Sequence, residues 1–289
     1  MVFNKDFIGM VSCFKNVKTL TSKSYNYRFN IDTGYFERWG ETLESDGDLN
    51  QGLPEIADIE ISTICSAGCK FCYKSNTSNG DNMSYETFVK LFEKLPISIT
   101  QIAFGIGDLP IHGEGGNPDL WKIFNHCREN YIVPNVTING FRMCDETADL
   151  LSKYCGAVAV SLYDKESTYN TIKMLTDRGM KQINIHYFLS DETYDRAFEL
   201  FNDVKNDSRL SKLNAIVFLS LKTKGRAKVN NYTPLSIDKF KNLMLTAMEK
   251  NIGIGFDSCS AQKAFESVKG LPNSDKLEQM IEPCESTLY

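Results

Sequence analysis

The sequence predicts an α/β fold, a partial (β/α)6 TIM-like barrel with an N-terminal β-hairpin extension. Three observations lead to this expectation. Short apolar runs alternate with helical patterns between about residues 56 and 258, several of these runs carry polar residues at every second position, and residues 1–55 show a hairpin pattern instead. Repeated strand–helix units require parallel strands joined by right-handed crossovers, so the sheet is either doubly wound or bent into a full or partial barrel.

The composition sets the first bounds. A chain of 289 residues with 42% hydrophobic and 24% charged residues is ordinary for one large globular domain with appendages. The net charge is −5 and no basic stripe is interleaved with aromatics, so no nucleic acid is expected as a partner. No apolar run approaches a membrane span, and residues 7–14 lack the features of a signal peptide. We therefore expect a cytoplasmic protein without membrane contact.

Residues 1–55 are expected to form an accessory region. The run YNYRFNIDTGYFERWGETL (25–43) reads as a hairpin that turns at Asp32, Thr33 and Gly34. Because this hairpin precedes the first strand–helix unit, it should pack against the core at residues 56–258. Residues 259–289 form a C-terminal segment.

Six strand–helix units and a further strand follow in order. The expected strands are 56–62, 99–105, 135–139, 157–163, 183–190, 215–222 and 252–258. Ser84 is a plausible N-cap, Pro118 suits a first helical turn, and Gly179 suits a helix end. The expected helices are 84–95, 118–130, 145–155, 168–179, 193–206 and 236–251.

Polar residues recur on one face of the sheet. Parallel strands covered on both faces are nearly continuous in apolar residues, and closed βα barrels fill their interior with bulky apolar layers. Here polar side chains alternate with Ile and Leu on at least four strands, which favours an open barrel holding a polar ligand over strand ends that reach solvent. The alternating residues are Glu60 and Ser62, Thr137 and Asn139, Asn184 and His186, and Ser220 and Lys222.

Three of the nine cysteines lie within CSAGCKFC, directly after the first expected strand. Chemistry in βα folds sits at this carboxyl edge of the sheet, and clustered cysteines without a signal peptide indicate metal ligation. A zinc site would want a second close pair, which the sequence lacks. Cys65, Cys69 and Cys72 can instead hold a cubane iron–sulfur cluster that is one ligand short. Its fourth iron is left for a substrate or cofactor, while Cys127, Cys144 and Cys155 are expected as small buried hydrophobes.

This pattern resembles the radical S-adenosylmethionine (SAM) superfamily over residues 55–258. The motif CxxxCxxC follows the first strand, with the aromatic Phe71 before its last cysteine. The resemblance implies a [4Fe–4S] cluster on the three cysteines and SAM chelating the fourth iron. It also implies that one electron cleaves SAM into methionine and a 5′-deoxyadenosyl radical, which takes a hydrogen atom from the substrate.

The resemblance also implies a set of SAM contacts. Gly105, Ile106, Gly107 and Asp108 stand where the family has a GGE-like segment, with Asp for Glu and Ile for one Gly; a plain strand-end turn is the alternative. For His186, a satisfied lumen histidine is favoured over a catalytic base, and no residue is assigned as catalytic. Residues 222–227 are read as a loop. The expected cofactor-binding residues are Phe71, Tyr73, Gly105, Gly107, Asp108, Asn139, Ser161, Asn184 and His186.

The C-terminal segment holds Cys259 and Cys284, about where a SPASM or twitch extension with auxiliary clusters would begin. Two cysteines cannot fill a four-cysteine site. Either an auxiliary iron–sulfur cluster forms because the chain continues beyond Tyr289, or both cysteines are structural.

The resemblance leaves the partners and the reaction open. It implies a flavodoxin- or ferredoxin-like electron donor and a peptide, protein or small-molecule substrate. The alternative function is a non-catalytic βα protein with zinc or a structural iron–sulfur cluster at residues 65–72.

Overall fold

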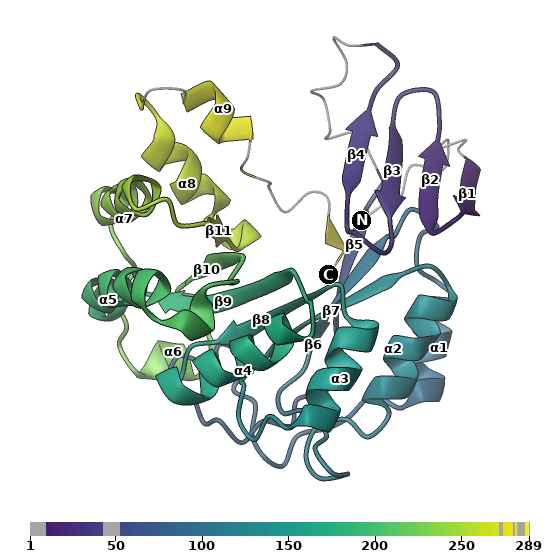
Figure 1. The fold of residues 1–289 in the computed structure, drawn as a ribbon, viewed down its shortest axis with the longest axis horizontal. Helices are drawn as coiled ribbons and strands as arrows, with labels where there is room; N and C mark the ends of the chain where they lie inside the picture. The colour runs from purple at the N-terminus through teal and green to yellow at the C-terminus, as the bar shows by residue number, and fades with distance from the viewer. Residues whose placement is uncertain (1–9, 43–52, 272–273, 280, 282–286, 289) are drawn as a thin grey trace.

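The computed structural model describes residues 10–42, 53–271, 274–279, 281 and 287–288. Its centre is a curved sheet in the order β11-β10-β9-β8-β7-β6-β5-β12, with every neighbouring pair parallel (Figure 1). The strands are β5 (Ile56–Glu60), β6 (Gln101–Gly105), β7 (Val133–Ile138), β8 (Ala157–Ser161), β9 (Gln182–Leu189), β10 (Ala215–Ser220), β11 (Ile254–Phe256) and β12 (Thr287–Leu288).

Helices cover the convex face of this sheet (Figure 1). The predicted partial barrel is confirmed, and each of the six expected helices is present within a few residues of its expected bounds. Ser84 caps the first helix by accepting a hydrogen bond from the Thr87 amide, as predicted. The helices are α1 (Tyr85–Phe92), α2 (Leu120–Glu129), α3 (Asp145–Tyr154), α4 (Lys165–Asp177), α5 (Tyr194–Asn206), α6 (Gly225–Val229), α7 (Ile237–Glu249), α8 (Ala261–Val268) and α9 (Ser274–Gln279).

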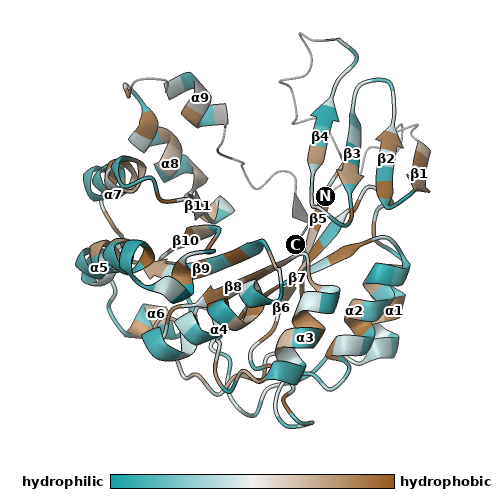
Figure 2. Ribbon diagram, in the orientation of Figure 1, coloured by the Kyte–Doolittle hydropathy of each residue, from teal (hydrophilic) through white to brown (hydrophobic). Residues whose placement is uncertain are grey.

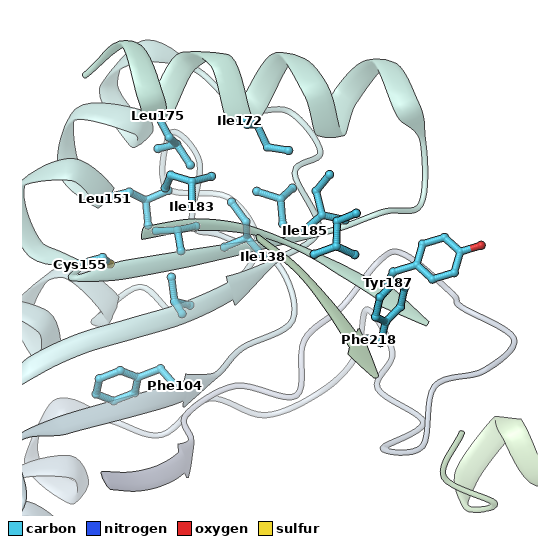
Figure 3. Packing of buried hydrophobic residues seen from close by; sticks show 14 of the residues in the cluster. Phe104, Ile138, Leu151, Cys155, Ile172, Leu175, Ile183, Ile185, Tyr187 and Phe218 are labelled. Atoms are coloured by element: carbon cyan, nitrogen blue, oxygen red, sulfur yellow. The ribbon is translucent and has the colours of Figure 1, made fainter. Parts of the chain in front are cut away.

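The core lies between the sheet and these helices. Ile183 and Ile185 of β9 are fully buried, and Ile172 and Leu175 of α4 point toward them (Figure 3). Hydropathy follows the same division, since the strands are largely brown and the outer helix faces largely teal in Figure 2. The alternation that buries one face of each strand leaves its other face toward the hollow of the half-barrel.

The concave face carries small and polar side chains. Asp58 on β5 is in register with Ala103, which in turn is in register with Asn135. Farther along the strands, Thr137 is in register with Ala159. Because residues in register point to the same face, these positions form rows that leave room for a ligand where closed barrels have bulky apolar layers.

The prediction of which residues of β10 face the hollow of the half-barrel is wrong by one position. Ile216 and Phe218 of β10 are fully buried under the helices, so Leu219 faces the hollow beside Phe188. Ser220 and Lys222 reach the hollow only because the strand ends there. The predicted loop over residues 222–227 is also incomplete, because α6 begins at residue 225.

The N-terminal region is larger than the predicted hairpin. The hairpin itself is present as β3 (Asn26–Asn30) and β4 (Phe36–Trp39), with Gly34 in the left-handed conformation at its turn. Two more strands, β1 (Met10–Phe14) and β2 (Val17–Thr21), complete an antiparallel sheet in the order β1-β2-β3-β4. The sequence does not predict β1, because this strand is mostly exposed and lacks the alternation of buried and exposed residues that marks a half-buried strand.

This small sheet packs at the amino ends of the core strands. Tyr27 is fully buried and donates from its hydroxyl to the carbonyl of Ser98, and Lys18 donates to the carbonyl of Ile99. Arg38 of β4 forms a bidentate ion pair with the buried carboxylate of Glu55.

In the part of the chain that the structure describes, no helix is long and apolar enough to cross a membrane.

Candidate active site

The three clustered cysteines lie on the loop that follows β5, which we call the cluster loop (residues 65–72). Its amino end is fixed by hydrogen bonds from the Cys65 amide to the Thr77 carbonyl and from the Asp108 amide to the Ile64 carbonyl. Gly107 has to be glycine here, because a Cβ at this position would lie 1.9 Å from the Ile64 oxygen. The loop after β6 therefore supports the cluster loop from one side.

Helix α6 supports the cluster loop from the other side. The Arg226 guanidinium donates from Nε to the Cys69 carbonyl at 2.8 Å, and the Arg226 amide donates to the Cys72 carbonyl at 2.9 Å. Gly225 has a φ of +55°, and a Cβ there would lie 2.4 Å from the Tyr73 carbonyl oxygen. A left-handed glycine thus lets the helix backbone approach the loop.

A cavity of about 490 Å³ opens between the cluster loop and the concave face of the sheet. All three clustered cysteines line it. The expected cofactor-binding residues also line it, with the exception of Asp108, so the structure brings together Phe71, Tyr73, Gly105, Gly107, Asn139, Ser161, Asn184 and His186.

Asp108 is not among the residues that line the cavity. Its carboxylate accepts a hydrogen bond from the Ser66 amide at 2.8 Å and another from the Asn139 side chain at 2.7 Å. The expected GGE-like carboxylate is therefore already engaged by the cluster loop and by the end of β7. In this arrangement Asp108 orients the loop that carries the cysteines.

Aromatic rings close one side of the cavity. Phe71 stacks on Phe188 of β9 with ring centroids 4.2 Å apart and planes 6° apart. Tyr163 and Tyr232 contact the same Phe71 ring at 5.8 and 6.3 Å between centroids. Tyr163 also hydrogen-bonds the Cys69 thiol, so the ring cluster and the sulfur share one partner.

Solved structures share this fold. SuiB of Streptococcus suis aligns with a TM-score of 0.55 at 12% identity, over 85% of this chain and 71% of that chain. The protein anSMEcpe with bound AdoMet and the Cp18Cys peptide aligns with a TM-score of 0.53 at 14% identity, over 75% of this chain and 66% of that chain. HydG, a maturase of the [FeFe]-hydrogenase, also has a TM-score of 0.53 at 14% identity, over 70% of this chain and 51% of that chain.

Sequence comparison adds one relative. The sporulation killing factor maturation protein SkfB of Bacillus subtilis (strain 168) is 25% identical over 150 residues, which cover 48% of this chain and 35% of SkfB. The chain thus spans about a third of the length of that relative. Searched against protein-family models, the chain matches none.

These comparisons show the half-barrel fold and a similarity to SkfB over part of the chain. Within this half-barrel, burial raises the pKa of the Cys65 and Cys69 thiols, and the Tyr163 hydrogen bond opposes the shift at Cys69. Metal binding requires the thiolate, so ligation would release the thiol protons.

Lys74 and Lys222 line the cavity, and each is paired with a carboxylate. Lys74 pairs with Glu60 at 2.9 Å, and Lys222 pairs with Asp257 at 3.1 Å. Burial lowers the pKa of His186 to about 4, so this imidazole is neutral at pH 7. Its Nδ1 lies 3.4 Å from the Thr137 hydroxyl, an arrangement that fits the satisfied lumen histidine expected from the sequence.

The remaining cysteines divide by burial. Cys127 and Cys155 are buried, and burial raises the pKa of both thiols, as expected for structural cysteines. Cys144 is half-buried at the start of α3. Cys259 is exposed, and Cys284 lies outside the described residues.

Sequence reasoning missed the supporting residues of this site. Arg226 and Tyr163 contact the cluster loop from residues far along the chain, and such contacts have no local signature. The alternating alanines of β8, Ala157 and Ala159, were a usable signal. They line the cavity because each lies on the concave face, where bulky residues would fill it.

Proposed function

We propose that this chain is a radical SAM enzyme in which Cys65, Cys69 and Cys72 hold a [4Fe–4S] cluster and the adjoining cavity takes SAM. One observation carries the proposal. Three thiols from a single loop line a cavity to which six neighbouring strands contribute residues, several of them small or polar. This is the layout that a cluster one ligand short and a polar cofactor require.

The charge of the proposed cluster is complementary to Arg226. Arg226 lines the cavity, and its buried Nη2 has no hydrogen-bond partner within the described residues. A buried guanidinium nitrogen without a partner is costly, and a cluster core held by three thiolates is anionic. A group of that charge beside the Cys69 and Cys72 carbonyls would offset the unpaired donor.

The zinc alternative has less support. A mononuclear zinc site needs ligands that converge to about 2.0–2.3 Å from one ion. Among the described residues, no three His, Cys, Asp or Glu side chains converge in this way. An auxiliary cluster would require cysteines in addition to Cys259 and Cys284.

Several residues of this chain would then bind and orient SAM. When bound, the cluster and SAM supply a 5′-deoxyadenosyl radical that abstracts hydrogen. The close-packed backbone at Gly105 and Gly107 bounds one end of the cavity, and Asn139 and Ser161 present polar groups along its wall. The stacked pair of Phe71 and Phe188 limits water access on the cluster side.

We infer that the substrate is a peptide. SkfB matures a sporulation killing factor, and anSMEcpe has been seen with a bound peptide. Both proteins resemble this chain, although the chain covers only part of each. A one-electron donor of the flavodoxin or ferredoxin class would supply the electron.

The decisive experiment measures 5′-deoxyadenosine. The chain is purified without oxygen, its iron and sulfide are restored, and SAM and dithionite are added. We expect product from the parent and from Cys13→Ala, which removes an exposed cysteine remote from the loop, and none from Cys69→Ala. Equal product from Cys69→Ala would refute the site, and a parent that binds zinc and no iron would favour the structural-metal alternative.

A further inference from the structure

One end of the cavity carries a single carboxylate. Among the described residues that line the cavity, Asp58 is the only Asp or Glu. It lies on the concave face of β5, because its neighbours Ala57 and Ile59 are buried on the opposite face. The positions in register with Asp58 on the next two strands are Ala103 and Asn135. The small side chain of Ala103 leaves space beside the carboxylate.

This end of the cavity is separate from the part next to the cysteines. Asn139, which bonds to the Asp108 carboxylate, marks the cluster end, and Asn135 marks the row of Asp58. Both asparagines line the cavity. Four residues of extended chain lie between them, which corresponds to roughly 13 Å along the strand. A group bound at Asp58 would therefore not occupy the space beside the cluster loop.

The two lysines whose charges act on Asp58 are both paired with other carboxylates. Lys74 pairs with Glu60 at 2.9 Å, and Lys222 pairs with Asp257 at 3.1 Å. Partial burial raises the pKa of Asp58, and the two lysines oppose this rise without cancelling it. Each lysine pair is neutral as a whole, so the negative charge of Asp58 remains uncompensated at this end.

The Asp58 carboxylate also lacks a hydrogen-bond donor. No donor in the part of the chain that the structure describes bonds to it. The neighbouring amide of Asn135 is satisfied, because it donates to Gln101 at 2.8 Å and accepts from the Ala157 backbone at 2.8 Å. An ionised carboxylate offers only acceptors, so a ligand at this position would have to supply donors.

We propose that Asp58 binds the cationic side chain of a Lys or Arg residue in the substrate peptide. This inference rests on the proposed function, because it takes a peptide as the substrate and the cluster end of the cavity as the SAM site. An ammonium or guanidinium group would supply both the positive charge and the donors that Asp58 lacks, and charge-assisted hydrogen bonds are among the strong ones. A long side chain held at this end would direct its carbon atoms toward the cluster loop. Asp58 would thus determine specificity and take no part in the radical step.

The test compares four proteins. They are the parent chain, Asp58→Asn, Asp58→Lys and a control, Asp238→Asn. The control removes one carboxylate of the same kind from an exposed position in the first turn of α7, outside the cavity. Asp58→Asn keeps the size of the side chain, so it is the variant that is expected to fold like the parent. Thermal unfolding checks that each variant is folded.

The probes are four short peptides that differ at one residue. Each is an acetylated and amidated pentapeptide with glycine on both sides of a central Lys, Arg, norleucine or Glu. Norleucine has nearly the size of lysine and no charge, so it separates charge from shape. Binding is measured by ligand-observed NMR titration of the anaerobically reconstituted chain with SAM and without reductant, because no turnover then occurs.

We expect the parent to bind the Lys and Arg peptides at least about 10-fold more tightly than the norleucine peptide. Asp238→Asn should keep this preference and Asp58→Asn should lose it. Asp58→Lys should favour the Glu peptide over the Lys peptide. A merely structural role of Asp58 would not invert the preference, because a damaged cavity would weaken the binding of all four peptides.

The outcomes separate this inference from the proposed function. A parent that binds the four peptides equally, or binds none of them, would overturn the assignment of Asp58. A preference for Lys and Arg that persists in Asp58→Asn would overturn it as well. Formation of 5′-deoxyadenosine by the parent is measured separately, and its absence would overturn the proposed function. Equal binding by a parent that does form 5′-deoxyadenosine would overturn the role of Asp58 alone.

Discussion

Replacement of Gly107 by alanine should disorganise the cluster loop. The new Cβ would lie 1.9 Å from the Ile64 oxygen and 2.6 Å from the Cys65 Cβ, so the loop after β6 would have to move away. That movement would break the 2.8 Å bond from the Asp108 amide to Ile64 and weaken the 2.8 Å bond from the Ser66 amide to the Asp108 carboxylate. Each half-buried hydrogen bond left unmade costs about 1–3 kcal/mol.

The free energy of unfolding should therefore fall by about 2–4 kcal/mol in Gly107→Ala. With a urea dependence of about 3 kcal/mol per M for a chain of this size, the urea midpoint should drop by about 1 M. Iron bound per chain after anaerobic reconstitution should fall as well. Gly255→Ala is the matched control, since its Cβ would meet only Val217 at an ordinary 3.6 Å. A Gly107→Ala protein with the parent's midpoint and iron content would refute the reasoning.

Three further predictions concern stability and iron content. The pKa of His186 is about 4 when folded and about 6.5 when unfolded, so its contribution to stability is complete above pH 6.5 and is lost as the pH falls toward 4. Urea titrations of His186→Gln should lose about 2 kcal/mol less than the parent between pH 7 and pH 5, and equal losses would refute the shift. Asn117→Ala should lower the free energy of unfolding by about 1–3 kcal/mol, because its buried amide donates to two backbone carbonyls; an unchanged thermal midpoint would argue against this. Arg226→Gln should retain less iron after gel filtration than the parent, since the bonds to the carbonyls of Cys69 and Asn76 are lost; full iron retention would contradict this role.

The βα core could be predicted because its signals are local. Apolar periodicity fixes which residues of a strand or helix face the core, and caps such as Ser84 mark where helices begin. The strand ends shifted by one or more residues, as at β7, which begins at Val133 and not at residue 135. Strand ends depend on pairing with neighbours, and the sequence of one strand does not contain that information.

Other features depended on contacts between distant residues. Strand β1 has few buried positions, so its sequence carries no alternation to read. The short helix α6 consists of five residues and begins with a glycine, and it is stabilised by the carbonyls it binds on the cluster loop. The cysteine motif, in contrast, could be recognised in the sequence because its three cysteines lie within eight residues. The direction in which Asp108 points could be learned only from the fold.

The contact between α6 and the cluster loop can form only late in the synthesis and folding of the chain. Arg226 and Asn230 lie 157 and 160 residues after the carbonyls they bind. When the cysteines of a nascent chain have left the ribosome, the contacts from α6 that support their loop are therefore still missing. These contacts can form only after nearly the whole half-barrel has been synthesised. Contacts of such long sequence separation form late, because the chain between them must be ordered first. Iron delivered before that stage would meet an unsupported loop, so the proposed cluster is expected to be the last part of this protein to mature.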